Sequence, residues 1–296
     1  MKKRMGCLLC AILILSCIGS AFAEAKVYYN VTPPDDWQER DLLRLIVFKT
    51  TLNAAMLLEY GGDALMVDGA MDKYANVLMD AYAGLGYNNT ADGHVYVPKI
   101  FNTHPHDDHL LGIYRLIRKG MTTDLFLTSF LPTYRNEMHQ KAIKEFEGRG
   151  IPIHYLAQNE QMRLGSAMLT FFWYAGGKDP NELSCCTRVE FGNASLLLTG
   201  DAVGNAQKGL LEQQPPEMLK ADILKAPHHS YTVMVKEFLD AVSPQLVFTT
   251  NWLTSTQDTA RQVERRNAIF LSHAKGRIVA ETDGEVWYVT QYPEQV

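Results

Sequence analysis

The stretch Thr103–His109 concentrates residues that bind metals or transfer protons. Its sequence, Thr-His-Pro-His-Asp-Asp-His, contains three histidines and two aspartates. His104 and His106 are two positions apart, so their side chains project to the same side of an extended chain. Asp108 and His109 begin the following helix and point in a different direction. Imidazole and carboxylate groups together suit zinc, manganese or iron, so we expect this stretch to bind one or two divalent cations.

The flanking residues predict that this stretch is a loop between a strand and a helix. Residues 95–97 and 99–101 form a strand pattern that Pro98 interrupts. The downstream helix is indicated by apolar residues at i, i+3, i+4 and i+7, namely Leu110, Ile113, Tyr114 and Ile117. Gly120 is well placed to end that helix. The stretch Thr103–His109 is therefore expected to follow the end of a strand and to lead into a helix.

Two later strand ends carry groups of the same character. An apolar run, residues 196–199, leads into Gly200-Asp201, where the glycine permits a tight turn and the aspartate projects from the strand end. The run 220–226 ends at Pro227 and is followed by His228 and His229. Each motif alone is weak, because Gly-Asp turns and histidine pairs are common on ordinary loops. Together with the first loop they make a coherent set of metal ligands.

The remaining chain alternates strand and helix patterns without repeats, low-complexity tracts or linkers, which predicts an α/β or α+β layered domain. Strands are expected at 42–48, 54–59, 64–67, 125–129, 151–156, 169–174, 187–191, 195–199, 222–225, 246–250, 277–281 and 286–290. Helices are expected at 71–85, 136–148, 233–241 and 256–267. Of the five cysteines, only Cys185 and Cys186 lie beyond residue 23, and we expect both to be buried and unpaired, with a redox pair as the alternative.

The first 23 residues read as a signal peptide. A basic start, an apolar run and Ala21-Phe22-Ala23 predict export, with cleavage after Ala23. Lipid attachment at Cys17 is the alternative. Residues 24–41 form a leader, and 42–296 form the expected single domain. Without the signal the formal net charge of −5 becomes about −8. Non-specific nucleic-acid binding is therefore unlikely, since it needs clustered basic residues. We expect a small-molecule or cell-surface substrate.

The order of these motifs resembles the metallo-β-lactamase superfamily, whose signature is His-x-His-x-Asp-His, then Gly-Asp, then His. The resemblance implies a four-layer αββα sandwich with a dinuclear site, usually of zinc. It implies that His104 and His106 bind one metal and that Asp108 and His109 bind the second. Asp201 would bridge the two. Asp68, at an earlier strand end, corresponds to a supporting aspartate.

The same resemblance leaves one choice open, because either His228 or His229 would complete the shell of the second metal while its neighbour contacts substrate. We take Asp108 and His228 as catalytic candidates. The cofactor expected is Zn²⁺, with Mn²⁺ or Fe²⁺ as alternatives. The C-terminal motifs resemble the hydrolase-like domain of bacterial DNA-uptake competence channels and its secreted relatives. One departure is the missing third histidine of the first metal, since only His139 and His154 lie in that interval.

These observations predict a secreted metal-dependent hydrolase that uses metal-activated water. The resemblance to the competence-channel branch implies phosphodiesters or other phosphorylated substrates as the first choice. No Gly-x-Ser-x-Gly or Cys-x-x-Cys motif occurs after residue 23, which leaves covalent hydrolases and zinc ribbons without support. A degenerate domain that binds a metal and a surface ligand without turnover is one alternative. A β-lactamase or lactonase is the other.

Overall fold

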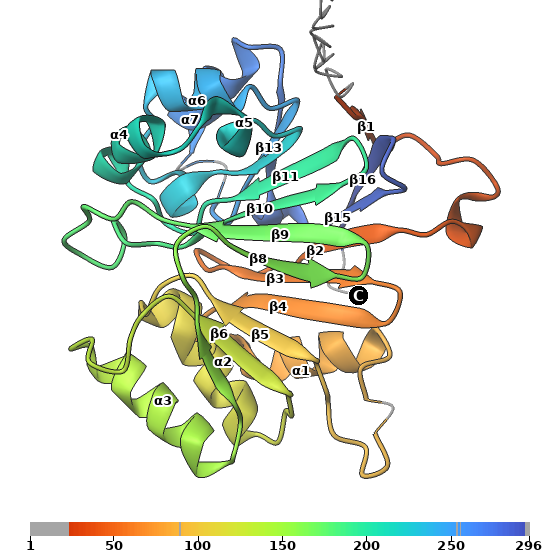
Figure 1. The fold of residues 1–296 in the computed structure, drawn as a ribbon. Coiled ribbons are helices and arrows are strands. Elements are labelled where there is room, and N and C mark those ends of the chain that lie inside the picture. Colours follow the sequence, from red (N-terminus) through yellow and green to blue (C-terminus); the bar gives the residue numbers. More distant parts are fainter. Residues whose placement is uncertain (1–23, 89, 253, 255, 294–296) are drawn as a thin grey trace, which may run out of the picture.

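The structure is a computed structural model that describes residues 24–88, 90–252, 254 and 256–293. Two β-sheets lie face to face, and helices cover the outer face of each (Figure 1). The four-layer αββα arrangement expected from the sequence is confirmed. The expected signal peptide and the alternative lipid site at Cys17 lie outside the described residues. In the part of the chain that the structure describes, no helix is long and apolar enough to cross a membrane.

The first sheet has nine strands. Across the sheet they are β1 (Lys26–Tyr29), β16 (Val286–Tyr292), β15 (Arg277–Thr282), β2 (Leu43–Val47), β3 (Ala55–Tyr60), β4 (Asp63–Gly69), β5 (Lys99–Asn102), β6 (Leu125–Thr128) and β7 (Ile153–Tyr155). Strands β4 to β7 run parallel, so their carboxyl ends meet at one edge of the molecule.

The second sheet has seven strands and, like the first, contains a parallel part and an antiparallel part. Across the sheet they are β14 (Ile269–Ser272), β13 (Leu246–Thr249), β12 (Ile223–Lys225), β11 (Ala194–Leu198), β10 (Cys186–Phe191), β9 (Ala167–Phe172) and β8 (Glu160–Leu164). Strands β11 to β14 run parallel, whereas β8 to β11 are antiparallel. Each sheet therefore contributes one set of aligned carboxyl ends.

Helices pack on the outer face of each sheet through apolar side chains. The first sheet is covered by α1 (Ala75–Gly84), α2 (Asp107–Arg118) and α3 (Glu137–Gly148). The second is covered by α4 (Gly204–Gln213), α5 (Pro216–Leu219), α6 (Lys236–Val242) and α7 (Gln257–Glu264). Short 3-10 turns occupy residues 37–39, 72–74, 227–230 and 273–275.

Strand β2 shows why both faces of a sheet are buried. Leu45 and Val47 belong to the core between the sheets, while Ile46 and Phe48 belong to the core beneath the helices. Alternate residues of a strand point to opposite faces, so a strand covered on both sides needs a continuous apolar run. This is why residues 42–48 were readable as a strand from the sequence.

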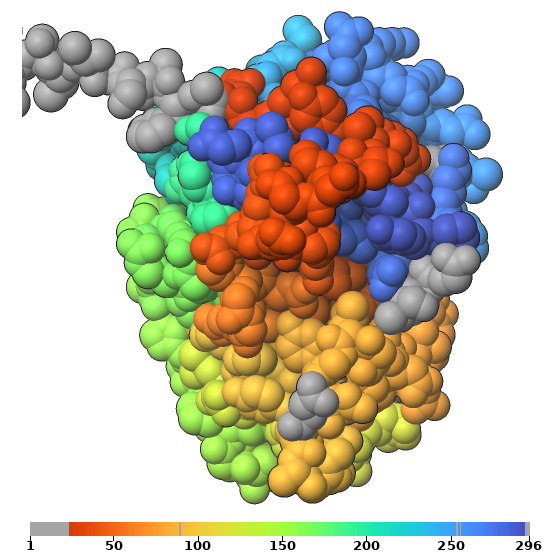
Figure 2. Space-filling model, turned by 90° about the vertical axis from the view of Figure 1, so that its right-hand side faces the viewer, coloured from red at the N-terminus to blue at the C-terminus, as the bar shows by residue number. Residues whose placement is uncertain are grey.

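The structure adds three strands to those expected. Residues 26–29 of the predicted leader form β1, which pairs in parallel with β16 at the edge of the first sheet. Figure 2 shows this N-terminal segment, in red, lying over the blue C-terminal strands. The strands β8 and β14 were also not expected, since β8 is polar and β14 is short. Residues 95–97 lie outside the strands, apart from an isolated bridge at Tyr96.

Helix α2 approaches β4 so closely that only glycine fits between them. The amide of Gly112 donates to the carbonyl oxygen of Ala70 at 2.8 Å. A Cβ atom on Gly112 would lie 1.7 Å from the carbonyl oxygen of Gly69. This contact brings the start of α2, with His109, beside Asp68 in β4.

We predict that Gly112→Ala destabilises the protein, because α2 must move away from β4. Overpacking of this kind typically costs about 1–3 kcal/mol of unfolding free energy, which corresponds to a melting temperature several degrees lower in a domain of this size. Gly148→Ala is the matched control, since nothing lies within 4 Å of its Cβ position in α3. It should raise stability slightly. Equal melting temperatures for the two variants would contradict this account of the contact.

Candidate metal centre

The metal-type residues gather where the parallel strands of both sheets end. Asp68 lies in β4, and the loop with His104 follows β5. Asp201 follows β11 and His229 follows β12, in the second sheet. In open parallel sheets ligands bind outside the carboxyl ends of the strands, where loops can converge. Here the two sheets supply opposite halves of one site.

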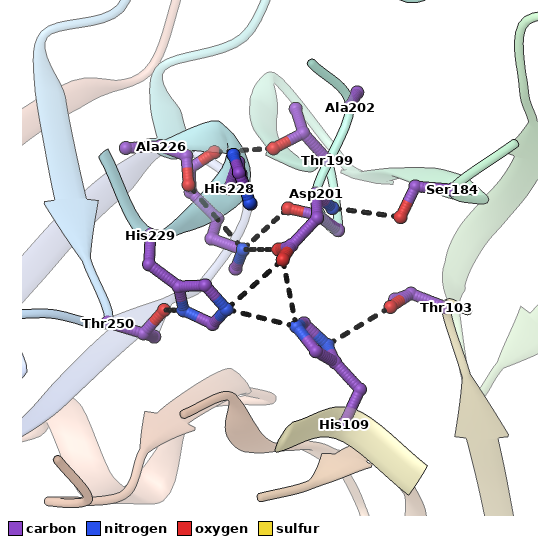
Figure 3. A network of polar contacts seen from close by, with 12 residues as sticks. Thr103, His109, Ser184, Thr199, Asp201, Ala202, Ala226, His228, His229 and Thr250 are labelled. Carbon is purple, nitrogen blue, oxygen red and sulfur yellow. Dashed lines mark hydrogen bonds and ion pairs between the residues drawn. The ribbon is translucent and has the colours of Figure 1, made fainter. Parts of the chain in front are cut away.

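Four side chains converge tightly at this edge. One ligand atom from each of Asp108, His109, Asp201 and His229 lies within 4.8 Å of all the others. Asp201 Oδ2 is 3.2 Å from His109 Nε2 and 3.1 Å from His229 Nε2, and Figure 3 shows the carboxylate between the two rings. His229 Nε2 is also 3.1 Å from Asp108 Oδ2. The resemblance implied Asp108, His109 and Asp201 as ligands of the second metal, with either His228 or His229 as the fourth.

His104 and His106 form a second pair next to this group. Their Nε2 and Nδ1 atoms are 3.1 Å apart, as expected for two residues on one side of an extended stretch. His104 Nε2 lies 3.8 Å from Asp201 Oδ2, and its ring centroid lies 4.1 Å from that of His109. The carboxylate of Asp201 thus lies between the two predicted ligand pairs.

The two neighbouring histidines point to different surroundings. His229 is buried, and its Nδ1 is 2.6 Å from the hydroxyl of Thr250, which turns Nε2 toward Asp201. His228 is only half-buried and lies 3.5 Å from the side-chain nitrogen of Asn181. Both residues have positive φ, at 47° for His228 and 50° for His229. This left-handed backbone separates the rings, and the geometry favours His229 as the ligand and leaves His228 at the rim.

Asp68 orients the first loop. Its carboxylate accepts hydrogen bonds from Asn102 Nδ2 at 3.0 Å and from the backbone amide and hydroxyl of Thr103, both at 2.8 Å. It also lies 2.6 Å from His109 Nδ1. A proton on that Nδ1 leaves Nε2 free to face Asp201, which is the arrangement that metal-binding histidines adopt.

Lys225 is a functional candidate that the sequence analysis did not single out. Its side chain is fully buried, and Nζ donates to the carbonyl oxygen of Gly200 at 2.6 Å. It also lies 3.4 Å from Asp201 Oδ1. The lysine therefore holds one carboxylate oxygen and leaves Oδ2 to the histidines. A lysine at the end of an apolar strand was the available signal, since buried lysines are rare unless paired.

The charges in the site are strongly coupled. Burial lowers the pKa of His104 well below its usual value, and nearby His109 lowers it further. Burial also opposes the charged form of His109, but Asp201 and Asp68 raise its pKa to about 10. His109, His229 and Lys225 outweigh burial and hold the pKa of Asp201 well below its usual range. Without a cation the His109 ring is thus protonated on both nitrogens near neutral pH. Metal binding at Nε2 would release the Nε2 proton.

Among the described residues, neither His139 nor His154 joins the pair of His104 and His106. His139 belongs to α3, with Nε2 3.1 Å from the carbonyl oxygen of Leu131. His154 belongs to β7 and lies beside Glu160. Instead, the hydroxyl of Ser184 lies 3.1 Å from His104 Nδ1 and accepts from the amide of Asp201 at 2.8 Å. Serine therefore links the two halves of the site.

Two other features lie outside this site. Cys185 and Cys186 are buried and unpaired, and burial raises the pKa of each thiol, so the expectation of two buried small residues is confirmed. A pocket of about 510 Å³ lies at the other end of β3 and β4, around the Gly61-Gly62 turn. It has no contact with the convergent histidines.

Comparisons with known structures agree with this fold. The chain resembles the CmlA beta-hydroxylase of Streptomyces venezuelae in a mutant form, at 13% identity and a TM-score of 0.51, with 84% of this chain covered. It spans about half (54%) of that chain. It also resembles the metallo-beta-lactamase fold protein YhfI from Bacillus subtilis, at 11% identity and a TM-score of 0.50, over 77% of this chain and 95% of that one. Identities this low bear on the fold alone.

Sequence comparisons give a family. No curated protein sequence matches the chain significantly. The profile of the metallo-beta-lactamase superfamily matches residues 50–245, a span that includes every predicted ligand. The chain therefore belongs to the metallo-beta-lactamase superfamily.

Proposed function

We propose that this protein is a hydrolase that depends on divalent cations, with zinc as the first choice. The observation that carries the proposal is the convergence of Asp108, His109, Asp201 and His229 within 4.8 Å. Two imidazoles and two carboxylates match the ligands that Zn²⁺ accepts, at the number it prefers. CmlA is described as a diiron beta-hydroxylase, which keeps iron as an alternative.

A second cation would be held by His104 and His106, with Asp201 shared between the two. When bound, such cations act as Lewis acids and make water a nucleophile near neutral pH. The chain's own cysteines are poor substitutes, because Cys185 and Cys186 are buried and their pKa values are raised. Activated water is therefore the nucleophile that this chemistry supports best.

The rim residues would handle the substrate and its protons. Burial lowers the pKa of His228, so its ring is neutral near pH 7 and can accept a proton. Its Nδ1 is buried and has no hydrogen-bond partner among the described residues. Tyr231 is half-exposed, and its ring centroid lies 5.3 Å from that of His228. These two side chains border the open side of the site, where a substrate would contact them.

Phosphodiesters or other phosphorylated molecules remain the substrate class we favour, by the resemblance to the competence-channel branch. A β-lactam or lactone substrate is the alternative within the hydrolases. A degenerate domain that binds without turnover would explain the missing third histidine. The convergence of every other ligand-type residue, with Asp68 and Lys225 orienting them, argues for turnover.

We predict different effects for the two adjacent histidines. His229→Ala and Asp201→Asn should each lower the metal content that remains after dialysis. Each should reduce metal affinity by more than the roughly 10–100-fold that is lost when a residue contacting a ligand is removed. His228→Ala should keep its metal and lose about 10²–10⁴-fold in turnover, the usual contribution of a proton-transfer group. Elemental analysis and rates with chromogenic phosphoesters measure the two effects. Metal loss in His228→Ala but not in His229→Ala would reverse the assignment.

We also predict that the two cations are held unequally. The group around His229 supplies four ligands, whereas His104 and His106 have only the shared Asp201 to add. Fewer ligands give weaker binding, so mild chelation should first remove the cation at His104 and His106. Activity should be lost together with that cation. Titration with chelator, followed by metal analysis and activity at each step, tests this. Simultaneous loss of both cations would mean that the site is symmetric.

Export is the last part of the proposal. The basic, apolar and Ala-x-Ala order of residues 1–23 predicts that secreted material begins at Glu24. N-terminal sequencing of protein recovered outside the cytoplasm decides this. A lipid-modified chain that begins at Cys17 would support the anchored alternative.

A further inference from the structure

A pocket of about 420 Å³, here called the aromatic pocket, opens between the loop after β6 and the end of β9. It is lined mainly by rings and aliphatic side chains, together with one cation: Phe130, Leu131, Tyr134, Trp173, Leu183 and Arg135. Pockets of about 300–1,000 Å³ with apolar walls and a few polar groups are typical of small-molecule sites. Nothing in the proposed chemistry of the metal centre uses these residues.

The aromatic pocket adjoins the metal centre on the side of His104. Ser129, which lines it, directly follows Thr128, and Thr128 pairs with Asn102, two residues before His104. Neighbouring strands lie about 4.8 Å apart, so the pocket begins one strand beyond the first ligand pair. From the other side, Leu183 directly precedes Ser184, whose hydroxyl contacts His104 Nδ1. The pocket therefore lies beside the two segments that position His104.

The loop that forms one wall is held in place by helix α3. The amide of Tyr134 donates to the carbonyl oxygen of Leu131 at 2.9 Å. Gln140 Nε2 donates to the carbonyl oxygens of Pro132 and Tyr134, at 2.6 and 2.7 Å. The rings of Phe130 and Tyr134 meet edge to face, with centroids 4.8 Å apart. This wall exists before any ligand arrives.

The opposite wall is held in the same way. The amide of Trp173 donates to Gln158 Oε1 at 3.2 Å, and its carbonyl oxygen accepts from Gln158 Nε2 at 2.7 Å. Two hydrogen bonds thus fix the backbone that carries the indole. Because both walls are preformed, binding costs little conformational entropy.

The polar groups of the aromatic pocket favour an anionic ligand. Arg135 is exposed and makes no hydrogen bond or ion pair with the described residues. Burial raises the pKa of Tyr134, and nearby Asp179 raises it further, so the phenol stays protonated and can donate a hydrogen bond. Asp179 is itself occupied by the amides of Asn181 and Glu182. A free guanidinium in a pocket lined by aromatic rings suits a flat aromatic group that carries a negative charge.

We propose that the aromatic pocket is a substrate subsite that binds a planar aromatic group bearing an anionic substituent, next to the ester hydrolysed at the metal centre. This inference rests on the proposed hydrolase function for its placement in catalysis. Trp173 supplies the stacking surface and Arg135 binds the anion. The substrate class is thereby narrowed to anionic aryl esters, phosphoesters first.

The test measures binding without relying on turnover. Calorimetry with the purified, metal-loaded chain compares three probes: 2-naphthalenesulfonate, neutral 2-naphthol and cyclohexanesulfonate. Trp173→Ala should weaken naphthalenesulfonate binding about 10-fold, the size of a lost stacking contact, and leave cyclohexanesulfonate unaffected. Arg135→Gln should reduce naphthalenesulfonate to the affinity of naphthol. Trp252→Ala and Arg118→Gln, which change exposed residues outside the pocket, are the matched controls.

Kinetics separate the subsite from the proposed function. With a naphthyl phosphate that carries a sulfonate on its ring, both pocket variants should raise KM with little change in kcat and unchanged metal content, because ground-state binding alone is lost. If naphthalenesulfonate binding depends on Trp173 and Arg135 but the protein shows no turnover, the subsite proposal stands and the hydrolase proposal is wrong. Turnover with unaltered probe binding in both variants would overturn the subsite and leave the hydrolase standing. If Trp173→Ala does not fold, Leu131→Asp at an exposed rim position should weaken naphthalenesulfonate binding by charge repulsion, and unchanged affinity there would overturn the proposal.

Discussion

The rest of the site depends on the buried carboxylate of Asp201. Only 2% of this residue is exposed, and an isolated carboxylate removed from water is very costly. The chain offsets that cost with Lys225 on one oxygen and with His109 and His229 on the other. Asp68 adds a second buried negative charge behind His109. A divalent cation at the centre would balance the negative charges of these carboxylates. It would also stabilise the folded chain, because it would bind the folded state and not the unfolded one.

This balance couples the metal centre to the packing of the two sheets. Asp68 and His109 belong to the half of the molecule built on β4, β5 and α2. Asp201, Lys225 and His229 belong to the half built on β11 and β12. The apolar core between the sheets sets the distance between the halves. The left-handed turn of three consecutive residues, His228 to Ser230, adds backbone strain at the same point. Strain of this kind persists only where surrounding contacts enforce it, here Thr250 and Asn251 on either side of His229.

The sequence predicted what depends on local pattern and missed what depends on tertiary contact. Apolar runs and His-x-His spacing gave the strands, α2 and the first ligand loop, because these signals lie within a few residues. The choice between His228 and His229 could not be read locally, since it follows from their φ values and from Thr250, which lies just after β13. Strand β1 was read as a leader because its pattern is polar, and only pairing with β16, far along the chain, makes it a strand. Lys225 lacked any local signal beyond a charge in an apolar run.

The predicted ligands are unevenly buried, so one side of the site is open to solvent. His104, His109, Asp201 and His229 are fully or almost fully buried, whereas the Asp108 side chain is 31% exposed and His106 and His228 are partly exposed. The side of the site that is open to solvent is therefore the one that carries His106, Asp108 and His228. From that side the aromatic pocket lies beyond His104, and Tyr231 lies beside His228. A molecule that reached from the aromatic pocket to His228 would pass over Asp201, so the proposed subsite would favour elongated substrates over compact ones.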